Sequence, residues 1–136
     1  VAEGAAGIYS EELLAPVPAS GRKHFDPVAA RPGLFSADET LRRLVSFREL
    51  NLHETPWPMR GRFDIIFCRN VVIYFSPEDQ LRLWRRFESV LNPGGWMFVG
   101  HSERIPLDPP CQLSTAGITT YKLPKTESPI GGPKWH

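Results

Sequence analysis

The chain has 136 residues, 41% of them hydrophobic, and its 16 basic residues stand against 15 acidic ones, for a formal net charge of +1. This length suits one domain with a sizeable hydrophobic core, and the near-neutral charge gives no reason to expect nucleic acid as a partner. No stretch approaches the roughly eighteen apolar residues of a transmembrane helix, so we expect no membrane insertion.

The two cysteines, Cys68 and Cys111, form neither a CxxC pair nor a cluster with histidines. This pattern indicates reduced thiols in a cytoplasmic protein, with no disulfide and no metal site. We interpret Cys68 as a packing residue.

The first third of the chain is interrupted by proline and glycine. We expect residues 1–19 to form a short helix and a linker, and residues 20–46 to form a small irregular insert or subdomain with a brief helix at Thr40–Leu44. Its basic residues indicate a solvated loop, with contact to an acidic partner as the alternative. The alternating apolar residues of 44–50 predict a strand that ends near Asn51.

Residues Phe63 to Tyr74, FDIIFCRNVVIY, are the most informative stretch. An apolar run without polar alternation, rich in β-branched and aromatic residues, predicts a strand that is covered on both faces. Arg69 and Asn70 follow it directly. The carboxyl end of a strand is where open α/β sheets bind ligands, so these two side chains are candidate binding residues.

A helix is predicted next, because Ser76-Pro77-Glu78-Asp79 combines a capping serine, a proline at the first helical position and two acidic residues. Apolar residues then recur at helical spacing to about Leu91, which is typical of an amphipathic helix that covers a sheet. The turn at 92–95 ends this helix, and 96–99 reads as a second buried strand. Strand, helix and strand together predict a βαβ unit.

Gly100-His101-Ser102-Glu103 follows the second strand at the same edge. His101 and Glu103 have two interpretations, acid-base chemistry or hydrogen bonding within the turn. Further on, 112–114 and 119–123 predict a closing hairpin, and residues 124–136 a disordered tail.

The segments FDIIFCRNVVIYF, SPEDQ, LNPGGWMFVGHSE and TAGITTYKL, in this order, resemble the chemotaxis receptor methyltransferases, the CheR family. The resemblance runs from about Gly7 to Leu123 and includes the stretch FRELNL. It implies an α/β chain with a partial Rossmann-like class I methyltransferase fold, whose mostly parallel sheet ends in a C-terminal antiparallel hairpin. Residues 47–123 would then be the C-terminal part of the methyltransferase domain.

The same resemblance implies S-adenosylmethionine as methyl donor and glutamate side chains on the cytoplasmic helices of chemoreceptors as acceptors. Carried over by position, Asn51 and Leu52 would hold the adenosine portion, Arg69 and Asn70 would form a second cofactor contact, and Tyr74 would lie near the transferred methyl group. A glutamate is already ionised at neutral pH, so the reaction needs alignment rather than a general base.

Three parts of the family pattern have no counterpart in the sequence: the helical N-terminal domain with its catalytic arginine, the first strand with its glycine-rich loop, and the acidic residue that binds the ribose. We therefore expect the chain to be the C-terminal part of the enzyme, and the isolated chain to bind the cofactor weakly or not at all and to be inactive. An edge strand without its partner would be exposed and prone to aggregation.

A further departure concerns receptor docking. Many family members bind a receptor's C-terminal pentapeptide by strand addition, with an Arg-Gly pair shortly after an aromatic residue. Here Phe25 is followed by Asp26-Pro27, so we expect independence from the pentapeptide. Two alternatives to the enzyme remain: a non-catalytic receptor-docking or regulatory module, and a class I methyltransferase that acts on a small molecule.

Overall fold

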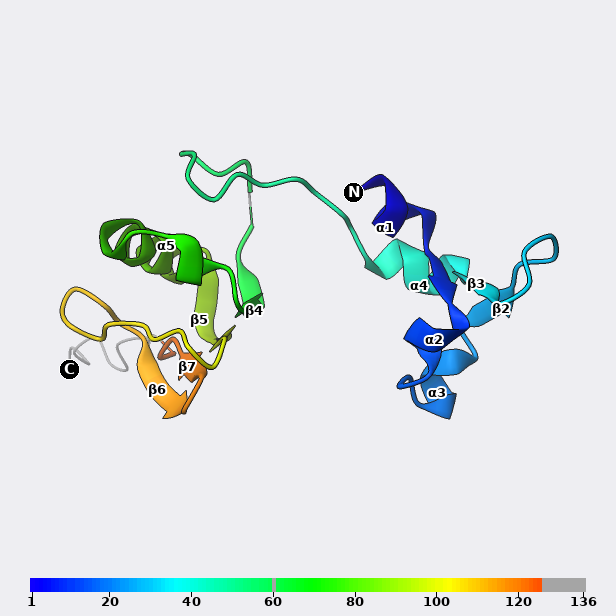
Figure 1. The fold of residues 1–136 in the computed structure, drawn as a ribbon. Helices are drawn as coiled ribbons and strands as arrows, with labels where there is room; N and C mark the ends of the chain where they lie inside the picture. Colours follow the sequence, from blue (N-terminus) through cyan, green and yellow to red (C-terminus); the bar gives the residue numbers. More distant parts are fainter. Residues whose placement is uncertain (60, 126–136) are drawn as a thin grey trace, which may run out of the picture. The chain divides into compact units, whose positions relative to one another are not determined.

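The computed structural model describes residues 1–59 and 61–125. It consists of two compact units, Val1–Leu50 and Asn51–His136, each of which is described by itself. Figure 1 shows the helices and strands of both.

The N-terminal unit is built around a three-stranded antiparallel sheet with strand order β1-β3-β2. Ser10 and Asp38 start α2 and α4, because each side chain accepts a hydrogen bond from the backbone nitrogen three residues on. The elements are α1 (Ala2–Ala6), β1 (Ile8–Ser10), α2 (Glu11–Leu14), α3 (Ala19–Arg22), β2 (Phe25–Pro27), β3 (Leu34–Ala37) and α4 (Glu39–Leu44).

The brief helix predicted at Thr40–Leu44 is confirmed as α4, and the helical turns expected before Leu14 are present on both sides of β1. The strand predicted over 44–50 is wrong. Val45 has the extended dihedral angles of a strand, φ −116° and ψ 131°, but residues 45–51 have no strand partner. An extended segment becomes a strand only when a neighbour supplies ladder hydrogen bonds, and alternation alone does not identify that neighbour.

The C-terminal unit contains a four-stranded sheet with strand order β4-β5-β7-β6. The pair β4 and β5 is parallel, α5 connects the two strands, and β6 and β7 form an antiparallel hairpin on the other side of β5, so the βαβ unit and the hairpin are confirmed. The sheet is mixed rather than mostly parallel. The elements are β4 (Phe63–Cys68), the 3₁₀ helix η1 (Val72–Tyr74), α5 (Pro77–Ser89), β5 (Leu91–Val99), β6 (Ser114–Gly117) and β7 (Thr120–Lys122).

Helix α5 starts where the sequence predicts. The Ser76 side chain accepts a hydrogen bond from the backbone nitrogen of Asp79 at 3.2 Å, and Pro77 occupies the first helical position. The predicted turn at 92–95 lies within β5, where it forms a bulge against β4. Phe63 of β4 pairs with Leu91 of β5, and Ile65 pairs with Trp96, so the β5 side has extra residues within 92–95. Gly94 takes a φ of 82° in this bulge, a conformation that glycine adopts without steric cost.

Helix α5 covers one face of the sheet, as seen in Figure 1. Buried residues on this face join the helix to the strands. The core cluster comprises Cys68, Val72, Leu83, Trp84, Phe87, Leu91, Met97, Val99, Ile105, Leu113, Tyr121 and Leu123.

The other face of β4 is not covered by the described residues of the C-terminal unit. Ile65 is 52% exposed and Phe67 is 70% exposed, so the prediction of a strand buried on both faces is wrong for this chain. The apolar run requires cover on two faces, and α5 supplies it on only one.

None of the helices in the described ranges has both the length and the apolar content that a membrane crossing needs. The predicted disordered tail, 124–136, falls almost wholly on residues 126–136, which lie outside the described part of the chain.

Candidate functional site

The polar loop at the carboxyl end of β4 begins with Arg69 and Asn70, and both side chains are exposed. Asn70 is the one non-glycine residue in the described ranges with a positive φ, 59°. Asparagine enters this left-handed conformation more readily than most residues. The structure thus places both predicted residues at the strand end where the sequence analysis expected them.

The carboxylate of Glu103 holds this loop. Glu103 is 3% exposed, and its Oε1 accepts hydrogen bonds from the backbone nitrogens of Val71 and Val72, both at 3.0 Å. Its Oε2 accepts from the backbone nitrogens of Asn70 at 3.1 Å and Gly100 at 2.6 Å. Of the two interpretations offered for Glu103, hydrogen bonding of the turn is the one that this geometry matches.

Gly100 makes the close approach of the two loops possible. A Cβ atom at this position would lie 2.6 Å from Oδ1 of Asn70 and 2.7 Å from Oε2 of Glu103. Any larger side chain would therefore push Asn70 away from the turn that follows β5. The loops after the two parallel strands are packed against each other at this point.

Tyr74 lies at the end of η1 and is 83% exposed. Two residues earlier, Val72 is 1% exposed and anchors η1 in the core. The next residue, Phe75, packs its ring against His53 with centroids 4.4 Å apart. The Tyr74 hydroxyl is consequently presented outward from a well-anchored turn.

The segment that begins at Asn51 forms its own turn. The Asn51 Oδ1 accepts a hydrogen bond from the backbone nitrogen of His53 at 3.0 Å, and its Nδ2 donates to Glu54 at 2.9 Å. Leu52 is half-buried and packs against the core cluster. Arg86 of α5 donates to the backbone oxygens of Leu52 at 2.9 Å and of Glu54 at 3.2 Å, which fixes this turn on the helix.

A cavity of about 310 Å³ lies beside this turn and is lined by Leu52, His53, Phe75, Asp79, Arg82 and Arg86. Of the five predicted site residues, Leu52 is the one that lines it. Arg69, Asn70 and Tyr74 form a second group at the end of β4, and Phe75 connects the two groups. Asn51 does not join either group through its side chain, because its amide is engaged in the turn.

Cys68, the last residue of β4, lies 5% exposed under this loop. Burial and, to a smaller extent, the charge of Glu103 raise the pKa of its thiol to about 11. Such a thiol stays protonated at neutral pH and is a poor nucleophile. This agrees with the interpretation of Cys68 as a packing residue.

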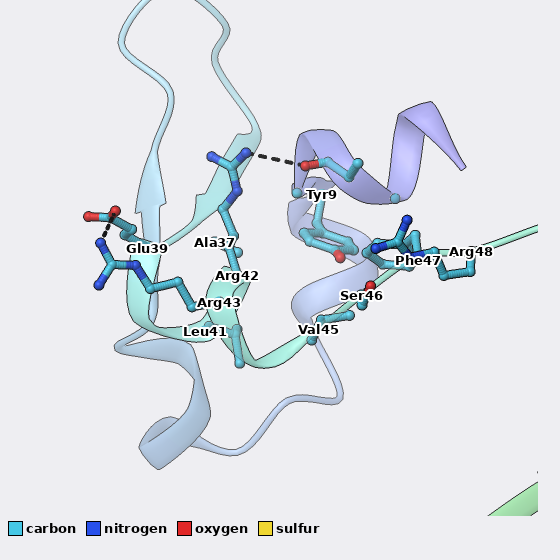
Figure 2. Close-up of a pocket in the computed structure, with 13 residues that line it drawn as sticks. Tyr9, Ala37, Glu39, Leu41, Arg42, Arg43, Val45, Ser46, Phe47 and Arg48 are labelled. Carbon is cyan, nitrogen blue, oxygen red and sulfur yellow. Dashed lines mark hydrogen bonds and ion pairs between the residues drawn. The ribbon is translucent and has the colours of Figure 1, made fainter. Parts of the chain in front are cut away.

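A second cavity, of about 800 Å³, belongs to the N-terminal unit and is bordered by α1, β1, α4 and residues 45–48. Figure 2 shows its arginines: Arg42 donates to the backbone oxygen of Ala5, and Arg43 pairs with Glu39. None of the five predicted site residues lines it. The described residues also contain no group of three or more His, Cys, Asp or Glu side chains that could hold a metal ion.

Sequence reasoning left open the role of Glu103 and did not single out Gly100 or Arg86. The sequence does contain a signal for Glu103, since Gly100 and Glu103 flank the turn directly after a predicted strand. Arg86 could not be found in this way, because its partners Leu52 and Glu54 are more than thirty positions away in the chain.

Comparison with known proteins shows which sequences this chain is similar to. The family described as CheR methyltransferase, SAM binding domain, matches residues 1–122. The chain is 42% identical over 119 residues to a "Probable chemotaxis protein methyltransferase" of Rhizobium etli, covering 86% of this chain and 44% of that protein. It is 44% identical over 99 residues to "Chemotaxis protein methyltransferase 2" of Pseudomonas aeruginosa, covering 71% of this chain and 35% of that protein.

A third relative, the "Chemotaxis protein methyltransferase" of Klebsiella aerogenes, is 43% identical over 126 residues, which cover 88% of this chain and 42% of that protein. The chain therefore spans less than half the length of the curated relatives it matches.

Proposed function

The chain belongs to the CheR methyltransferase family, and from this premise we propose that it forms part of the S-adenosylmethionine-binding domain of a cytoplasmic protein-glutamate O-methyltransferase. The full-length protein would methylate glutamate side chains on the cytoplasmic helices of chemoreceptors. The fold of the whole domain would be Rossmann-like, with β4, α5 and β5 as one of its βαβ units.

One observation carries this proposal. The parallel pair β4 and β5 brings two polar loops to one edge of the sheet, and there Glu103 joins the loop that contains Arg69 and Asn70 to the turn at Gly100. Ligands of open α/β sheets bind at the carboxyl ends of the strands. This edge offers exposed polar side chains on a backbone that is held in place.

The residues present fit the proposed cofactor in kind. The Arg69 guanidinium suits the carboxylate of the methionine moiety, and the Asn70 amide suits a polar group of the cofactor. Leu52 offers an apolar surface for the adenosine portion, whereas the Asn51 amide would need to exchange a partner in its own turn to bind. Tyr74 would lie near the transferred methyl group, where its exposed hydroxyl orients the acceptor carboxylate.

Methyl transfer requires the protein to align the reacting atoms of donor and acceptor. When bound, S-adenosylmethionine would supply a methyl group on a positively charged sulfur, and a carboxylate oxygen of the receptor glutamate would take up this group while the electron pair of the carbon–sulfur bond stays with sulfur. No proton is transferred, because the glutamate is ionised at neutral pH. The site's tasks are to bring oxygen, carbon and sulfur into line and to exclude water.

Independence from a receptor pentapeptide is also proposed, and the hydrogen-bond pattern of β2 supports it. Within the described residues, β2 pairs only with β3. The backbone oxygen of His24 accepts from Asp38 at 2.8 Å, and the nitrogen of Val28 donates to Leu34 at 2.9 Å, so alternate residues of β2 face β3.

The residues between them, Phe25 and Pro27, direct their backbone groups to the free edge. Pro27 has no N–H, so this edge offers a donor from Phe25 alone, and a peptide strand added there would lack a ladder hydrogen bond. Calorimetry with an acidic-aromatic receptor peptide and the full-length protein tests this part of the proposal. Binding that is abolished by a substitution in residues 20–46 would contradict it.

The main test is an assay of the full-length protein with methyl-tritiated S-adenosylmethionine and membranes that carry a chemoreceptor. We expect label on the receptor that mild base releases as methanol, because a carboxyl methyl ester hydrolyses and an N-methyl group does not. A receptor in which the candidate glutamates are replaced by alanine is the control. A protein that binds the receptor and leaves it unlabelled would be a docking module, and the enzyme proposal would fail.

A further inference from the structure

We propose that Glu103 is a positioning residue for the methyl donor, which acts by fixing the backbone that carries Arg69 and Asn70. This inference rests on the proposed function. It concerns a residue with no expected contact to the cofactor, whose influence would reach the cofactor through the loop after β4.

The Glu103 carboxylate accepts hydrogen bonds from both loops. Four backbone N–H groups from two loops converge on one carboxylate, at 2.6 to 3.1 Å, and each oxygen accepts two of them. Three of the donors belong to the consecutive residues Asn70, Val71 and Val72. A carboxylate is the side chain best able to accept several N–H groups at once, since it is an acceptor only and carries a full charge.

The Glu103 side chain is also shielded from solvent. Glu103 is 3% exposed, and it is the one buried charged residue among those the structure describes. Leaving a carboxylate without partners in such a place is costly, so the four N–H groups and the carboxylate hold each other in place. The loop thereby has one defined conformation even though the Arg69 and Asn70 side chains project into solvent.

Asn70 has a left-handed backbone conformation. Its φ of 59° is unfavourable for a non-glycine residue and persists where the surroundings impose it. Here the surroundings are the bond from its own nitrogen to Glu103 and the contact of its side chain with Gly100. The left-handed turn at Asn70 sets the direction in which Arg69 and Asn70 leave the strand, so Glu103 controls where the two side chains point.

The test uses Glu103→Gln in the full-length protein. The amide nitrogen of glutamine cannot accept, so it would face backbone donors that need an acceptor. We expect the dissociation constant for S-adenosylmethionine to rise at least about tenfold, comparable to the loss of other partners that orient a binding residue. The KM for the receptor should change less than this dissociation constant, because Arg69 and Asn70 would bind the donor, whereas Tyr74 near the acceptor follows Val72, which is also anchored in the core.

Glu88→Gln is the matched control. Glu88 is a half-buried carboxylate of the same unit that accepts a backbone hydrogen bond, from Gln112 at 3.1 Å, but it lies near the end of α5, away from the β4 loop. We expect this variant to lose some thermal stability and to keep the affinity for the cofactor. Equal loss of affinity in both variants would overturn the positioning role, because it would indicate a general loss of folding.

Gly100→Ala provides a second route if Glu103→Gln does not fold. The added methyl group would meet Oδ1 of Asn70 at 2.6 Å and displace the same loop without a change of charge. Weakened cofactor binding in this folded variant supports the proposal, and unchanged affinity overturns it. Titration of the wild-type protein with S-adenosylmethionine tests the proposed function independently of either variant. If the wild-type protein does not bind S-adenosylmethionine at all, the proposed function fails.

Discussion

The ring of Phe67 on β4 stacks on the ring of Phe98 on β5, with centroids 4.7 Å apart and planes 15° from parallel. Trp96 continues the stack along β5 at 6.5 Å from Phe98. These rings lie on the face of the sheet that the described residues of the C-terminal unit leave uncovered, so within this unit a row of aromatic side chains lies beside the outer strand β4.

This row predicts that the 136-residue chain by itself associates with further copies through β4, because exposed apolar surface next to an unpaired strand edge favours pairing. Replacing Ile65 and Phe67 by threonine should raise the dissociation constant at least about tenfold, as expected from burial of two large side chains. Sedimentation at several concentrations measures this. Ile118→Thr, at a residue that is 80% exposed and outside β4, is the control; an equal effect there would contradict a role for β4.

Tyr74→Phe is expected to lower kcat of the full-length protein at least about tenfold, within the range for loss of a hydroxyl that orients reacting groups. Because Tyr74 is 83% exposed, thermal stability should stay the same. Tyr121→Phe is the contrasting control: the Tyr121 hydroxyl accepts a hydrogen bond from the backbone nitrogen of Ile105 at 3.2 Å, so its loss should reduce stability and spare kcat. Full activity of Tyr74→Phe would contradict a role of the Tyr74 hydroxyl in the reaction.

Arg86→Ala should release the turn at Leu52 from α5, because the guanidinium donates to two backbone oxygens there. We expect a loss of about 2 kcal/mol in the free energy of unfolding, the usual effect of hydrogen bonds to a charged group. Hydrogen exchange at residues 52–54 should also become faster. Arg85→Ala, at the exposed neighbouring position on the helix, serves as control, and equal losses in both variants would argue against a specific role for Arg86.

The start of α5 should depend on pH through Asp79. Hydrogen bonds from Ser76 and Arg82 hold the pKa of Asp79 below its ordinary value of 3.8. A carboxyl group whose pKa is lowered by folding stabilises the protein above its unfolded pKa, and this contribution disappears as the pH falls through the folded pKa. Asp79→Asn should therefore be less stable than wild type at pH 7, and the difference should disappear as the pH falls below 3.8 and through the lowered pKa of Asp79.

Thermal unfolding from pH 2.5 to 7 tests this prediction. Glu78→Gln, one position earlier on the exposed side of the same turn, is the control. A difference between Asp79→Asn and wild type that stays constant over this range would contradict the assignment.

Cys68 should resist thiol reagents in the folded protein. With a pKa of about 11, only about 0.1% of the thiol is ionised at pH 8, and the side chain is 5% exposed. Cys111, whose pKa is also raised by burial but which is only half-buried, should react first. Iodoacetamide labelling with peptide mapping, before and after denaturation, measures both; labelling of native Cys68 as fast as Cys111 would refute the prediction.

Local chemistry made several elements predictable. Ser76 and Pro77 mark the start of α5 because capping depends on neighbours in the chain, and the apolar run 63–68 reads as a strand because its length and residue types exclude most alternatives. The two polar residues after this strand follow from the same reasoning. The expectation for 44–50 failed because a strand needs a partner, which no local pattern supplies.

The amino-acid sequence by itself determined the βαβ order, the position of Arg69 and Asn70 at a strand end, and the family resemblance, since all of these depend on residue types at fixed spacing. The tertiary structure alone decided that Glu103 binds four backbone N–H groups of two loops, that Arg86 holds the Leu52 turn, and that Ile65 and Phe67 remain exposed. These relationships join residues about thirty positions apart or depend on what covers a face, and only the packed chain brings such groups within hydrogen-bond distance.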